Sequence, residues 1–271
     1  MIPFTKAHAY GNDFLYVPAA RLPEGGPGRW AQKLCDRHRG LGADGLILYE
    51  PTGEGARMSL FNADGSPSEL SGNGVRGLAA VIARDWPDAA QPAGRSLTIE
   101  TVAGPKQLRL KEVRATSYLF AAQMGHPTGL ARRELTIDGE TVTVSVLAIG
   151  NPQCVVLGPL PDESAFARLG PALERHPAFP DRTNVEFAHV LAPDRVAIRI
   201  WERGVGPTES SGTGSCAAAV AACAHGGAGR DVEVIAPGGS QRVEWDAQNT
   251  VWLTGWAEIV LRGRWTRPTP A

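Results

Sequence analysis

The chain is predicted to form two similar α+β domains related by a pseudo-twofold axis, each a mostly antiparallel sheet or barrel around one central helix. A duplicated motif is the first observation. Ser71-Gly-Asn-Gly and Ser211-Gly-Thr-Gly lie 140 residues apart, and each precedes a small, apolar helical run. The second observation is that both halves are otherwise rich in alternating strand patterns. We expect domains at residues 1–115 and 116–257, with the stretch from about 258 to 271 returning to the first. The two helix N-termini would then face each other across a cleft.

The duplicated motif has the chemistry of an anion-binding helix start. Glu69 and Glu209 precede the two serines at the same distance. A serine hydroxyl can cap free backbone amides, and the glycines let backbone N–H groups approach a ligand. The partial positive charge of a helix N-terminus attracts a carboxylate. An ordinary N-cap explains either serine alone, but two copies at matching positions favour one shared site.

Composition excludes several classes of protein. The 271 residues include 27 basic and 28 acidic side chains, so the net charge of −1 offers no attraction for nucleic acid or an anionic membrane. The start of the chain lacks the pattern of a secretory signal, and no apolar stretch approaches the roughly 20 residues of a membrane span. Four scattered cysteines without a Cys-x-x-Cys pair indicate free thiols in a reducing cytoplasm. The histidines lack metal-ligand spacing, so we expect no metal site.

Strand and helix patterns in the first half surround the first serine motif. A turn is expected near the start of the chain at Gly11-Asn12. Loops are expected at the Pro/Gly-rich residues 23–28 and at residues 87–94. The expected helices are residues 30–38 and the run from Ser71 to about Arg84. The expected strands are residues 15–17, 46–48, 57–61, 97–101, 107–110 and 117–120.

The second half repeats this order. Gly150-Asn151 matches Gly11-Asn12 at an offset of 139 residues, and Glu202 matches Asn62 at 140. An amphipathic helix with an acidic cap is expected at residues 162–175, and the second central helix follows Ser211. The expected strands are residues 141–147, 183–187, 196–201, 231–235, 241–245, 250–254 and 257–261.

Asparagine placement adds an independent signal. Five of the six asparagines lie in these turns or at strand starts: Asn12, Asn62, Asn73, Asn151 and Asn184. Turn formation alone can explain any single one of them. Together they indicate an amide-lined pocket for a zwitterion. Glu202-Arg203 can be a surface ion pair, or it can hold the ammonium and carboxylate groups of such a ligand.

These residues carry a family resemblance that spans almost the whole chain. The chain resembles the diaminopimelate epimerases, the cofactor-independent amino-acid isomerases of lysine biosynthesis. The resemblance implies two similar domains, an amino-acid substrate and no cofactor, and it allows a homodimer. The matching stretches are Gly11-Asn-Asp-Phe, Cys35 to Gly45, Phe61-Asn-Ala-Asp-Gly-Ser, Ser71-Gly-Asn-Gly-Val-Arg, Gly150-Asn-Pro, Thr183-Asn-Val-Glu-Phe, and Trp201-Glu-Arg-Gly through Gly212-Thr-Gly.

The resemblance also implies the chemistry. In the family, one cysteine thiolate removes the α-proton and a second cysteine thiol protonates the opposite face, which interconverts LL- and meso-diaminopimelate. The positions carried over for substrate binding are Asn12, Asn62, Gly72, Asn73, Asn151, Asn184, Glu202, Arg203, Gly212 and Thr213. The backbone amides at both caps would stabilise charge on the substrate carboxylate.

The chain departs from the family at the acid–base groups. Both cysteine positions are serine, Ser71 and Ser211, and the histidine that assists the first cysteine is Gln153. Glu202, which assists the second cysteine, is present. A serine hydroxyl is a poorer base than a thiolate, whose pKa of about 8.5 falls further at a helix N-terminus. Gln153 alongside both serines favours natural divergence over an introduced pair of substitutions.

Three functions remain open from the sequence. The first is a diaminopimelate epimerase that uses Ser71 and Ser211 as its acid–base groups. The second is a related racemase, or a lyase that eliminates a β-substituent with Ser211 and Glu202 as its one competent base. The third is a non-catalytic amino-acid-binding protein. Cys216 is an alternative base inside the second helix, although free cysteines are usually buried.

Overall fold

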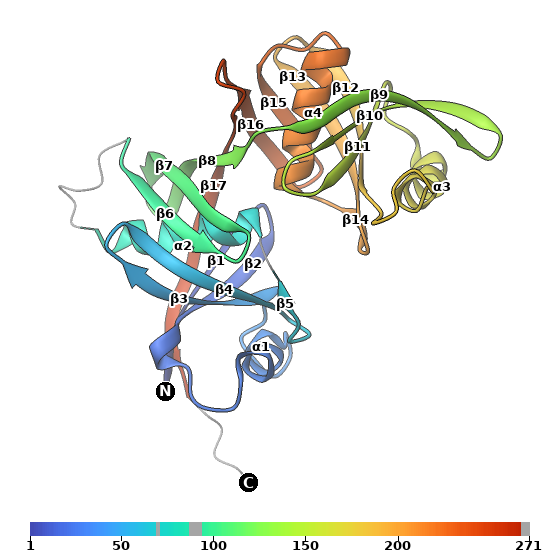
Figure 1. The fold of residues 1–271 in the computed structure, drawn as a ribbon. Coiled ribbons are helices and arrows are strands. Elements are labelled where there is room, and N and C mark those ends of the chain that lie inside the picture. The colour runs from blue at the N-terminus through green and yellow to red at the C-terminus, as the bar shows by residue number, and fades with distance from the viewer. Residues whose placement is uncertain (69–70, 87–93, 267–271) are drawn as a thin grey trace. The chain divides into compact units, whose positions relative to one another are not determined.

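The computed structural model describes residues 1–68, 71–86 and 94–266 (Figure 1). The chain divides into two compact units, Met1–Ala122 with Gly255–Ala271, and Gln123–Thr254. From the sequence, boundaries are expected before residue 116 and before about residue 258. Strands β8 (Ser117–Gly125) and β17 (Val251–Trp265) each run through a unit boundary without a break. Because no linker occurs there, composition does not mark either boundary.

The first unit contains most of the N-terminal half and the end of β17. Its helices are η1 (Ala19–Arg21), α1 (Pro27–Cys35) and α2 (Gly72–Arg84). Its strands are β1 (Ile2–Ala9), β2 (Asn12–Pro18), β3 (Gly45–Thr52), β4 (Gly55–Asn62), β5 (Pro67–Ser68), β6 (Ser96–Thr101), β7 (Gly104–Arg114) and the start of β8. The end of β17 pairs antiparallel with β1, from Trp265 opposite Ile2 to Glu258 opposite His8. The C-terminal stretch therefore returns to this unit up to residue 265, and residues 267–271 lie outside the described part.

The second unit repeats this organisation. Its helices are α3 (Glu163–Glu174) and α4 (Gly212–His225). Its strands are β9 (Thr128–Ile137), β10 (Glu140–Ala148), β11 (Pro152–Leu157), β12 (Asn184–Ala192), β13 (Arg195–Glu202), β14 (Gly206–Thr208), β15 (Asp231–Ala236), β16 (Gly239–Trp245) and the start of β17. With four α-helices among the described residues and strands elsewhere, the chain is α+β, as predicted.

Strand pairing shows that the duplication extends to topology. In the first unit β2–β3 and β4–β6 are parallel, whereas β3–β4 and β6–β7 are antiparallel. In the second unit β11–β12 and β13–β15 are parallel, whereas β12–β13 and β15–β16 are antiparallel. The parallel pairs are joined through helices, as such crossovers require. Each unit thus builds the same mixed, mostly antiparallel sheet.

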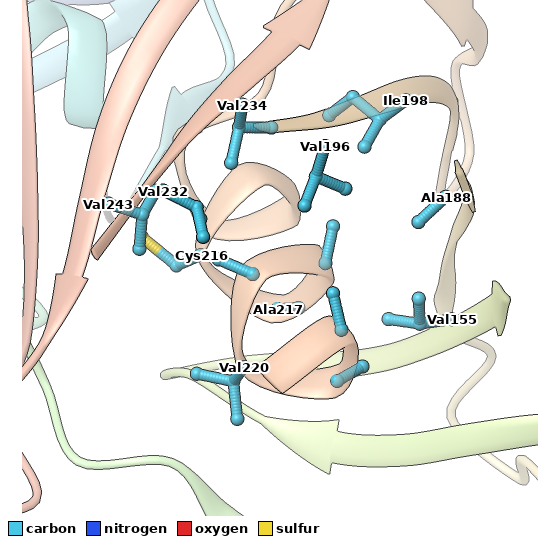
Figure 2. Close-up of a cluster of buried hydrophobic side chains, with 14 of the residues drawn as sticks. Val155, Ala188, Val196, Ile198, Cys216, Ala217, Val220, Val232, Val234 and Val243 are labelled. Atoms are coloured by element: carbon cyan, nitrogen blue, oxygen red, sulfur yellow. The ribbon is translucent and has the colours of Figure 1, made fainter. Parts of the chain in front are cut away.

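Helix α4 forms the core of the second unit. It is apolar on every side, which is the pattern of a fully buried helix, and it contacts strands β10 to β13, β15 and β16. Cys216, Ala217 and Val220 of the helix lie among valines and other small apolar side chains of these strands (Figure 2). Its alanines allow strands to approach closely on all faces. The second serine motif is therefore fixed by the start of a rigid, buried helix.

Helix α2 has the same place in the first unit. It contacts β1, β2, β4, β6 and β7. Tyr16 on β2 is fully buried and donates a hydrogen bond from its hydroxyl to the Gly74 carbonyl at 3.1 Å. A Cβ at Gly77 would lie 2.0 Å from that hydroxyl oxygen, so this helix position accepts only glycine without a shift. Burial raises the pKa of Tyr16, which keeps the hydroxyl protonated as a donor.

Two sequence predictions need correction here. The first helix was expected at residues 30–38, but α1 spans Pro27–Cys35. Pro27 suits the first helical position, and Asp36 ends the helix by accepting hydrogen bonds from the backbone N–H groups of His38 and Arg39, both at 2.8 Å. Strand β9 was not predicted, because its polar, arginine-containing sequence lacks an apolar run.

Several other predicted elements are confirmed, but the strands expected at residues 250–254 and 257–261 are one continuous strand, β17. Helix α3 begins after Asp162, whose carboxylate accepts from the Ala165 N–H at 2.8 Å. Helix α2 ends at Arg84, as expected. Residues 87–93 of the predicted loop, and Glu69 of the first repeat, lie outside the described residues. No helix within the described ranges is long and apolar enough to cross a membrane.

Candidate active site

Ser71 caps helix α2 in the first unit. Its backbone is extended, its Oγ accepts from the Gly74 N–H at 3.1 Å, and its carbonyl accepts from the Val75 N–H at 2.9 Å. Ser71 and Gly72 are only partly buried, and the space where a Gly72 Cβ would lie holds no atom within 4 Å. The first turn of α2 can therefore be approached closely by a ligand, and its partial positive charge favours an anion.

A chain of hydrogen bonds fixes the amides beside this cap. Asn12 Nδ2 donates to Asp44 Oδ2 at 2.8 Å, which leaves Asn12 Oδ1 to accept from Asn73 Nδ2 at 3.4 Å. Asn73 Oδ1 in turn accepts from Arg76 Nη1 at 3.3 Å. Because carboxylates only accept and guanidinium groups only donate, both ends of the chain assign the orientation of each amide. The structure thus brings together Asn12 and Asn73, two of the predicted site residues.

Asp44 is itself held by a charged cluster that sequence reasoning missed. Arg37 Nη2 lies 2.8 Å from both Asp44 Oδ1 and Asp13 Oδ1, and Lys6 Nζ lies 2.9 Å from Asp13 Oδ2. Burial acts to raise the pKa of Asp13, but hydrogen bonds and charge from Arg37 and Lys6 outweigh it and hold the pKa below its usual range. Asp13 therefore stays ionised, and the cluster is a rigid support for Asn12.

Asn62 lies apart from this chain of bonds. It ends strand β4, is exposed, and donates from Nδ2 to Ser66 Oγ at 3.0 Å within its own turn. Within the described ranges, no hydrogen bond joins it to Asn12 or to the Ser71 cap. Its amide oxygen remains available to a ligand, so its place in a substrate site stays a prediction.

Ser211 caps α4 in the second unit by the same contacts. Its backbone is extended, Oγ accepts from the Gly214 N–H at 3.2 Å, and the carbonyl accepts from the Ser215 N–H at 3.0 Å. Ser211, Gly212 and Thr213 are partly exposed, whereas Gly214 is buried. The two predicted helix starts therefore have equivalent geometry in their own units.

Predicted residues of the second unit gather where β11, β12 and β13 meet. Gln153 lies opposite Asn184 in the parallel β11–β12 pair. Asn184 Nδ2 donates to the Pro152 carbonyl at 3.2 Å, and its Oδ1 accepts from the Arg203 N–H at 3.0 Å. Asn184 therefore holds the start of β11 and the turn after β13 together. The Arg203 guanidinium donates to the Asp181 carbonyl at 3.0 Å, so its contact is not an ion pair with Glu202.

A buried carboxyl group, Glu186, lies behind these residues. Its side chain on β12 is fully buried, and the Gln153 carboxamide lies 3.0 and 3.2 Å from its two oxygens. Burial, and then the charge of Glu202, raise the pKa of Glu186 well above its usual value. Burial likewise raises the pKa of Glu202. Glu186 was not singled out from the sequence, where the only signal was an acidic residue between Val185 and Phe187.

Cys216, the alternative base considered from the sequence, lies in the core of the second unit. Cys216 is fully buried in the core around α4 (Figure 2), so its thiol is remote from any ligand. All four cysteines are free thiols. Across the described ranges, no group of three or more His, Cys, Asp or Glu side chains is arranged to hold a metal ion.

The fold is shared with solved structures described as epimerases and isomerases. The chain is similar over 99% of its length to a predicted epimerase from Pseudomonas aeruginosa, all of which is covered, with a TM-score of 0.72 and 14% identity. It is similar to a methylitaconate-delta-isomerase with a TM-score of 0.68 and 15% identity, over 99% of both chains. These likenesses define the class of fold to which the chain belongs.

Sequence comparison then gives the particular family. The diaminopimelate epimerase family model matches residues 4–130 and 145–260. The chain is 42% identical to the diaminopimelate epimerase of Desulforudis audaxviator, over 97% of this chain and 99% of that protein. It is 38% identical to the enzyme of that name from Desulfovibrio desulfuricans, over 97% of both. The chain belongs to the diaminopimelate epimerase family of amino-acid isomerases.

Proposed function

We propose that this protein interconverts LL- and meso-diaminopimelate by proton transfer at the α-carbon, with Ser71 and Ser211 as the two acid–base groups. The observation that carries the proposal is the equivalence of the two caps. Each serine begins a buried central helix and accepts one backbone N–H, at 3.1 Å in the first unit and 3.2 Å in the second. Membership of the diaminopimelate epimerase family supports the substrate.

The helix starts are proposed to bind the carboxylate at the reacting carbon. Gly72-Asn73 and Gly212-Thr213 would supply backbone N–H groups and the helix-end charge from each unit. Preorganised amides of this kind stabilise negative charge that develops in the transition state.

The remaining predicted residues are proposed to bind the non-reacting end of the substrate. Amide groups, a carboxylate and a guanidinium group suit an amino acid, since its ammonium needs acceptors and its carboxylate needs donors. Asn184 already links three segments, so its position is fixed before any ligand arrives. The residues proposed for this role are Asn12, Asn62, Asn151, Asn184, Glu202 and Arg203.

A second function is favoured by what the serine hydroxyls contact. A hydroxyl becomes a useful base only when a neighbouring group takes its proton. In the described structure, the hydrogen bonds of Ser71 and Ser211 side chains are those to Gly74 and Gly214. That arrangement suits a protein that binds an amino acid without turning it over. An eliminating lyase with one base would use Ser211 with Glu202, whose pKa is raised by burial.

Deuterium exchange at the α-carbon separates these functions. The protein would be incubated in D₂O with LL-diaminopimelate, and incorporation would be followed by mass spectrometry. Ser71→Gly and Ser211→Gly are the decisive variants, because glycine keeps most of the capping stability while removing the hydroxyl. Ser210→Ala is the matched control next to the second cap. Exchange that both glycine variants lose supports the epimerase.

Other outcomes assign the alternatives. Exchange with one stereoisomer that only Ser211→Gly abolishes would favour the lyase. No exchange, with diaminopimelate still raising the melting temperature, would favour the binding protein. We further propose a homodimer from the family resemblance, and light scattering of the purified protein at several concentrations would test it.

A further inference from the structure

Gln153 lies between a buried acid and two predicted ligand-binding residues. One atom of its carboxamide lies 3.0 Å from Glu186 Oε1 and 3.2 Å from Glu186 Oε2. The other lies 2.6 Å from Asn151 Oδ1 and 3.2 Å from Thr213 Oγ1. Oxygen and nitrogen can exchange places in an amide of this shape, so two hydrogen-bond arrangements share the same atomic positions. Which arrangement holds depends on the proton of Glu186.

An ionised Glu186 accepts hydrogen bonds only, so Gln153 Nε2 would have to be the carboxamide atom that faces the Glu186 oxygens. Gln153 Oε1 would then face Asn151 Oδ1 at 2.6 Å, and two acceptors cannot share such a contact. Asn151 would have to reverse its amide as well. A neutral Glu186 instead donates its O–H to Gln153 Oε1, and Gln153 Nε2 donates to Asn151 Oδ1. The second arrangement gives both the oxygen and the nitrogen of the Gln153 amide a suitable partner and needs no reversal of Asn151.

We propose that Glu186 is a positioning residue that, as a neutral carboxylic acid, donates to Gln153 Oε1 and turns the Gln153 amide nitrogen toward Asn151 and Thr213. Glu186 also lies against the first turn of α4. A Cβ at Gly214 would lie 2.6 Å from Glu186 Oε1, so glycine is required for this close approach. Glu186 therefore acts on the Ser211 half-site through two contacts, one to Gln153 and one to the helix start.

The surroundings of Glu186 favour the neutral form. Its side chain is fully buried, and the titratable groups facing it are Glu202 from β13 and Cys154 from β11, neither of which is a cation. Burial and then the charge of Glu202 raise its pKa. The N-terminus of α4 would favour an anion, but the Gly214 N–H already donates to Ser211 Oγ at 3.2 Å. Residues 212–215 of the helix start carry no charged side chain.

The proton on Glu186 therefore decides which hydrogen-bond donors of Asn151 and Thr213 are left for a ligand. With Asn151 Oδ1 occupied by Gln153, Asn151 Nδ2 is left to donate to a ligand. With Gln153 Nε2 near Thr213 Oγ1, the Thr213 hydroxyl proton is also left to a ligand. A hydroxyl donor beside the positive end of α4 fits the carboxylate at the reacting carbon, and an amide donor at Asn151 fits the carboxylate of the non-reacting end. Ionisation of Glu186 would reverse both amides, engage the Thr213 hydroxyl and turn an acceptor toward the carboxylate.

Infrared spectroscopy tests the proton directly. We expect the carbonyl stretch of a protonated carboxylic acid in the wild-type protein at pH 7, and its loss in Glu186→Gln. Glu202→Gln is the matched control and retains the band assigned to Glu186. Absence of a wild-type minus Glu186→Gln band at pH 7 would overturn the proposal. If Glu186→Gln does not fold, Gln153→Ala replaces it as the test variant. The carboxylic acid band of Glu186 should then shift, because its O–H loses Gln153 Oε1 as its acceptor.

Nuclear magnetic resonance tests the positioning without a ligand. The side-chain amide resonances of Gln153, assigned by their absence in Gln153→Ala, should move with the same pH midpoint as the infrared band. In Glu186→Gln they should stay constant, since a glutamine amide there donates to Gln153 Oε1 at every pH. Equal movement in both proteins, or movement with a different midpoint, would show that Glu186 does not position Gln153.

Calorimetry with meso-diaminopimelate tests the link to the ligand, and this arm rests on the proposed function. Affinity for the wild-type protein should fall by about tenfold as Glu186 ionises, because hydrogen bonds to a charged carboxylate are lost. Glu186→Gln should keep its affinity over the same range. An equal fall in both would refute the donor role. If the wild-type protein binds no diaminopimelate at any pH, the proposed function fails while the spectroscopic results still decide the role of Glu186.

Discussion

The hydroxyls of Ser71 and Ser211 each cap a helix by accepting one backbone hydrogen bond. The donors are the N–H groups of Gly74 and Gly214, the second glycine of each motif. This contact gives each hydroxyl a structural role that is independent of any reaction. Replacement by alanine would therefore remove a cap, at a cost of about 0.5–2 kcal/mol in the free energy of unfolding, as well as an acid–base group. Variants at these positions need a stability measurement beside every activity measurement.

Asp44 is predicted to affect how tightly diaminopimelate binds near the Ser71 cap. It is not among the substrate-binding positions that the family resemblance implies. Asp44→Ala removes the acceptor that orients Asn12, which leaves the Asn12 amide held, within the described ranges, only by its contact with Asn73. We expect diaminopimelate binding to weaken by about tenfold, the value of roughly one hydrogen bond to a charged group. Calorimetry would measure the change.

Asp231→Ala is the matched control for Asp44→Ala. Asp231 pairs with Arg242 at 2.6 Å between β15 and β16, at an exposed position in the second unit. Its loss should leave affinity unchanged. Equal affinity of Asp44→Ala and the wild-type protein would mean that Asn12 does not depend on this support.

At this scale the sequence predicted residue types better than contacts. Asn12 and Asn73 were expected in one site and are bonded to each other, whereas the Asn62 side chain, among the described residues, bonds to Ser66 within its own turn. Glu186 and Asp44 escaped notice because their roles come from partners distant in sequence, Gln153 and Asn12. The sequence alone does not distinguish these two carboxyl groups from those of other strand or turn residues, because their partners become neighbours only in the folded chain.

Helices α2 and α4 show why small residues occur in both central runs. Each helix is enclosed by strands on several sides, so side chains larger than alanine are excluded at the closest approaches. This packing explains the apolar, alanine-rich pattern that follows both serine motifs.

Gly77→Ala is predicted to destabilise the protein, whereas Gly72→Ala on the same helix is not. A Cβ at Gly77 would lie 2.0 Å from the buried Tyr16 hydroxyl, while a Cβ at Gly72 meets no atom within 4 Å. Overpacking of this kind costs about 1–3 kcal/mol in the free energy of unfolding. Chemical denaturation of both variants would measure it. Equal stability of the two would contradict the packing described for α2.

Periodicity predicted both central helices and helix α3, including the Asp162 cap. It misplaced α1, because Pro27 lies in a Pro/Gly-rich stretch that resembles a loop. It missed β9, whose pairing with β10 rather than its own composition makes it a strand. Local patterns thus predict elements with a buried face better than elements defined by their neighbours.

The whole molecule should lose stability in acid through the cluster around Asp13. Its pKa is held low in the folded state, so its contribution to stability is complete above the unfolded value of about 3.9 and is lost as the pH falls through the folded pKa. Asp13→Asn removes this proton linkage. The difference in unfolding free energy between wild type and variant should be largest above pH 4 and shrink below it.

Denaturant unfolding between pH 6 and pH 2.5 would measure that difference. Asp231→Asn, at an exposed pair, is the control and should follow the wild-type curve. A difference for Asp13→Asn that stays constant across the range would show that Asp13 has no lowered pKa in the folded protein.

Duplication was predicted at the scale of the whole chain from two short motifs. The strand pairings repeat accordingly, with parallel β2–β3 and β4–β6 in one unit and β11–β12 and β13–β15 in the other. The boundaries between the two compact units, after Ala122 and before Gly255, fall inside the continuous strands β8 and β17. A repeat can be found from sequence alone, but a boundary inside a strand has no composition to mark it.

The central claim is that an epimerase frame is retained while its acid–base groups are altered, and replacement of both serines by cysteine tests it most directly. The rate of α-deuterium exchange into LL-diaminopimelate would be compared for the wild-type protein, Ser71→Cys/Ser211→Cys and Ser71→Gly/Ser211→Gly. Effective general acid–base catalysis contributes about 10²–10⁴-fold, so the cysteine variant should exceed the wild-type rate by an amount on that order. A folded cysteine variant that binds diaminopimelate but exchanges no faster than the glycine variant would contradict the account.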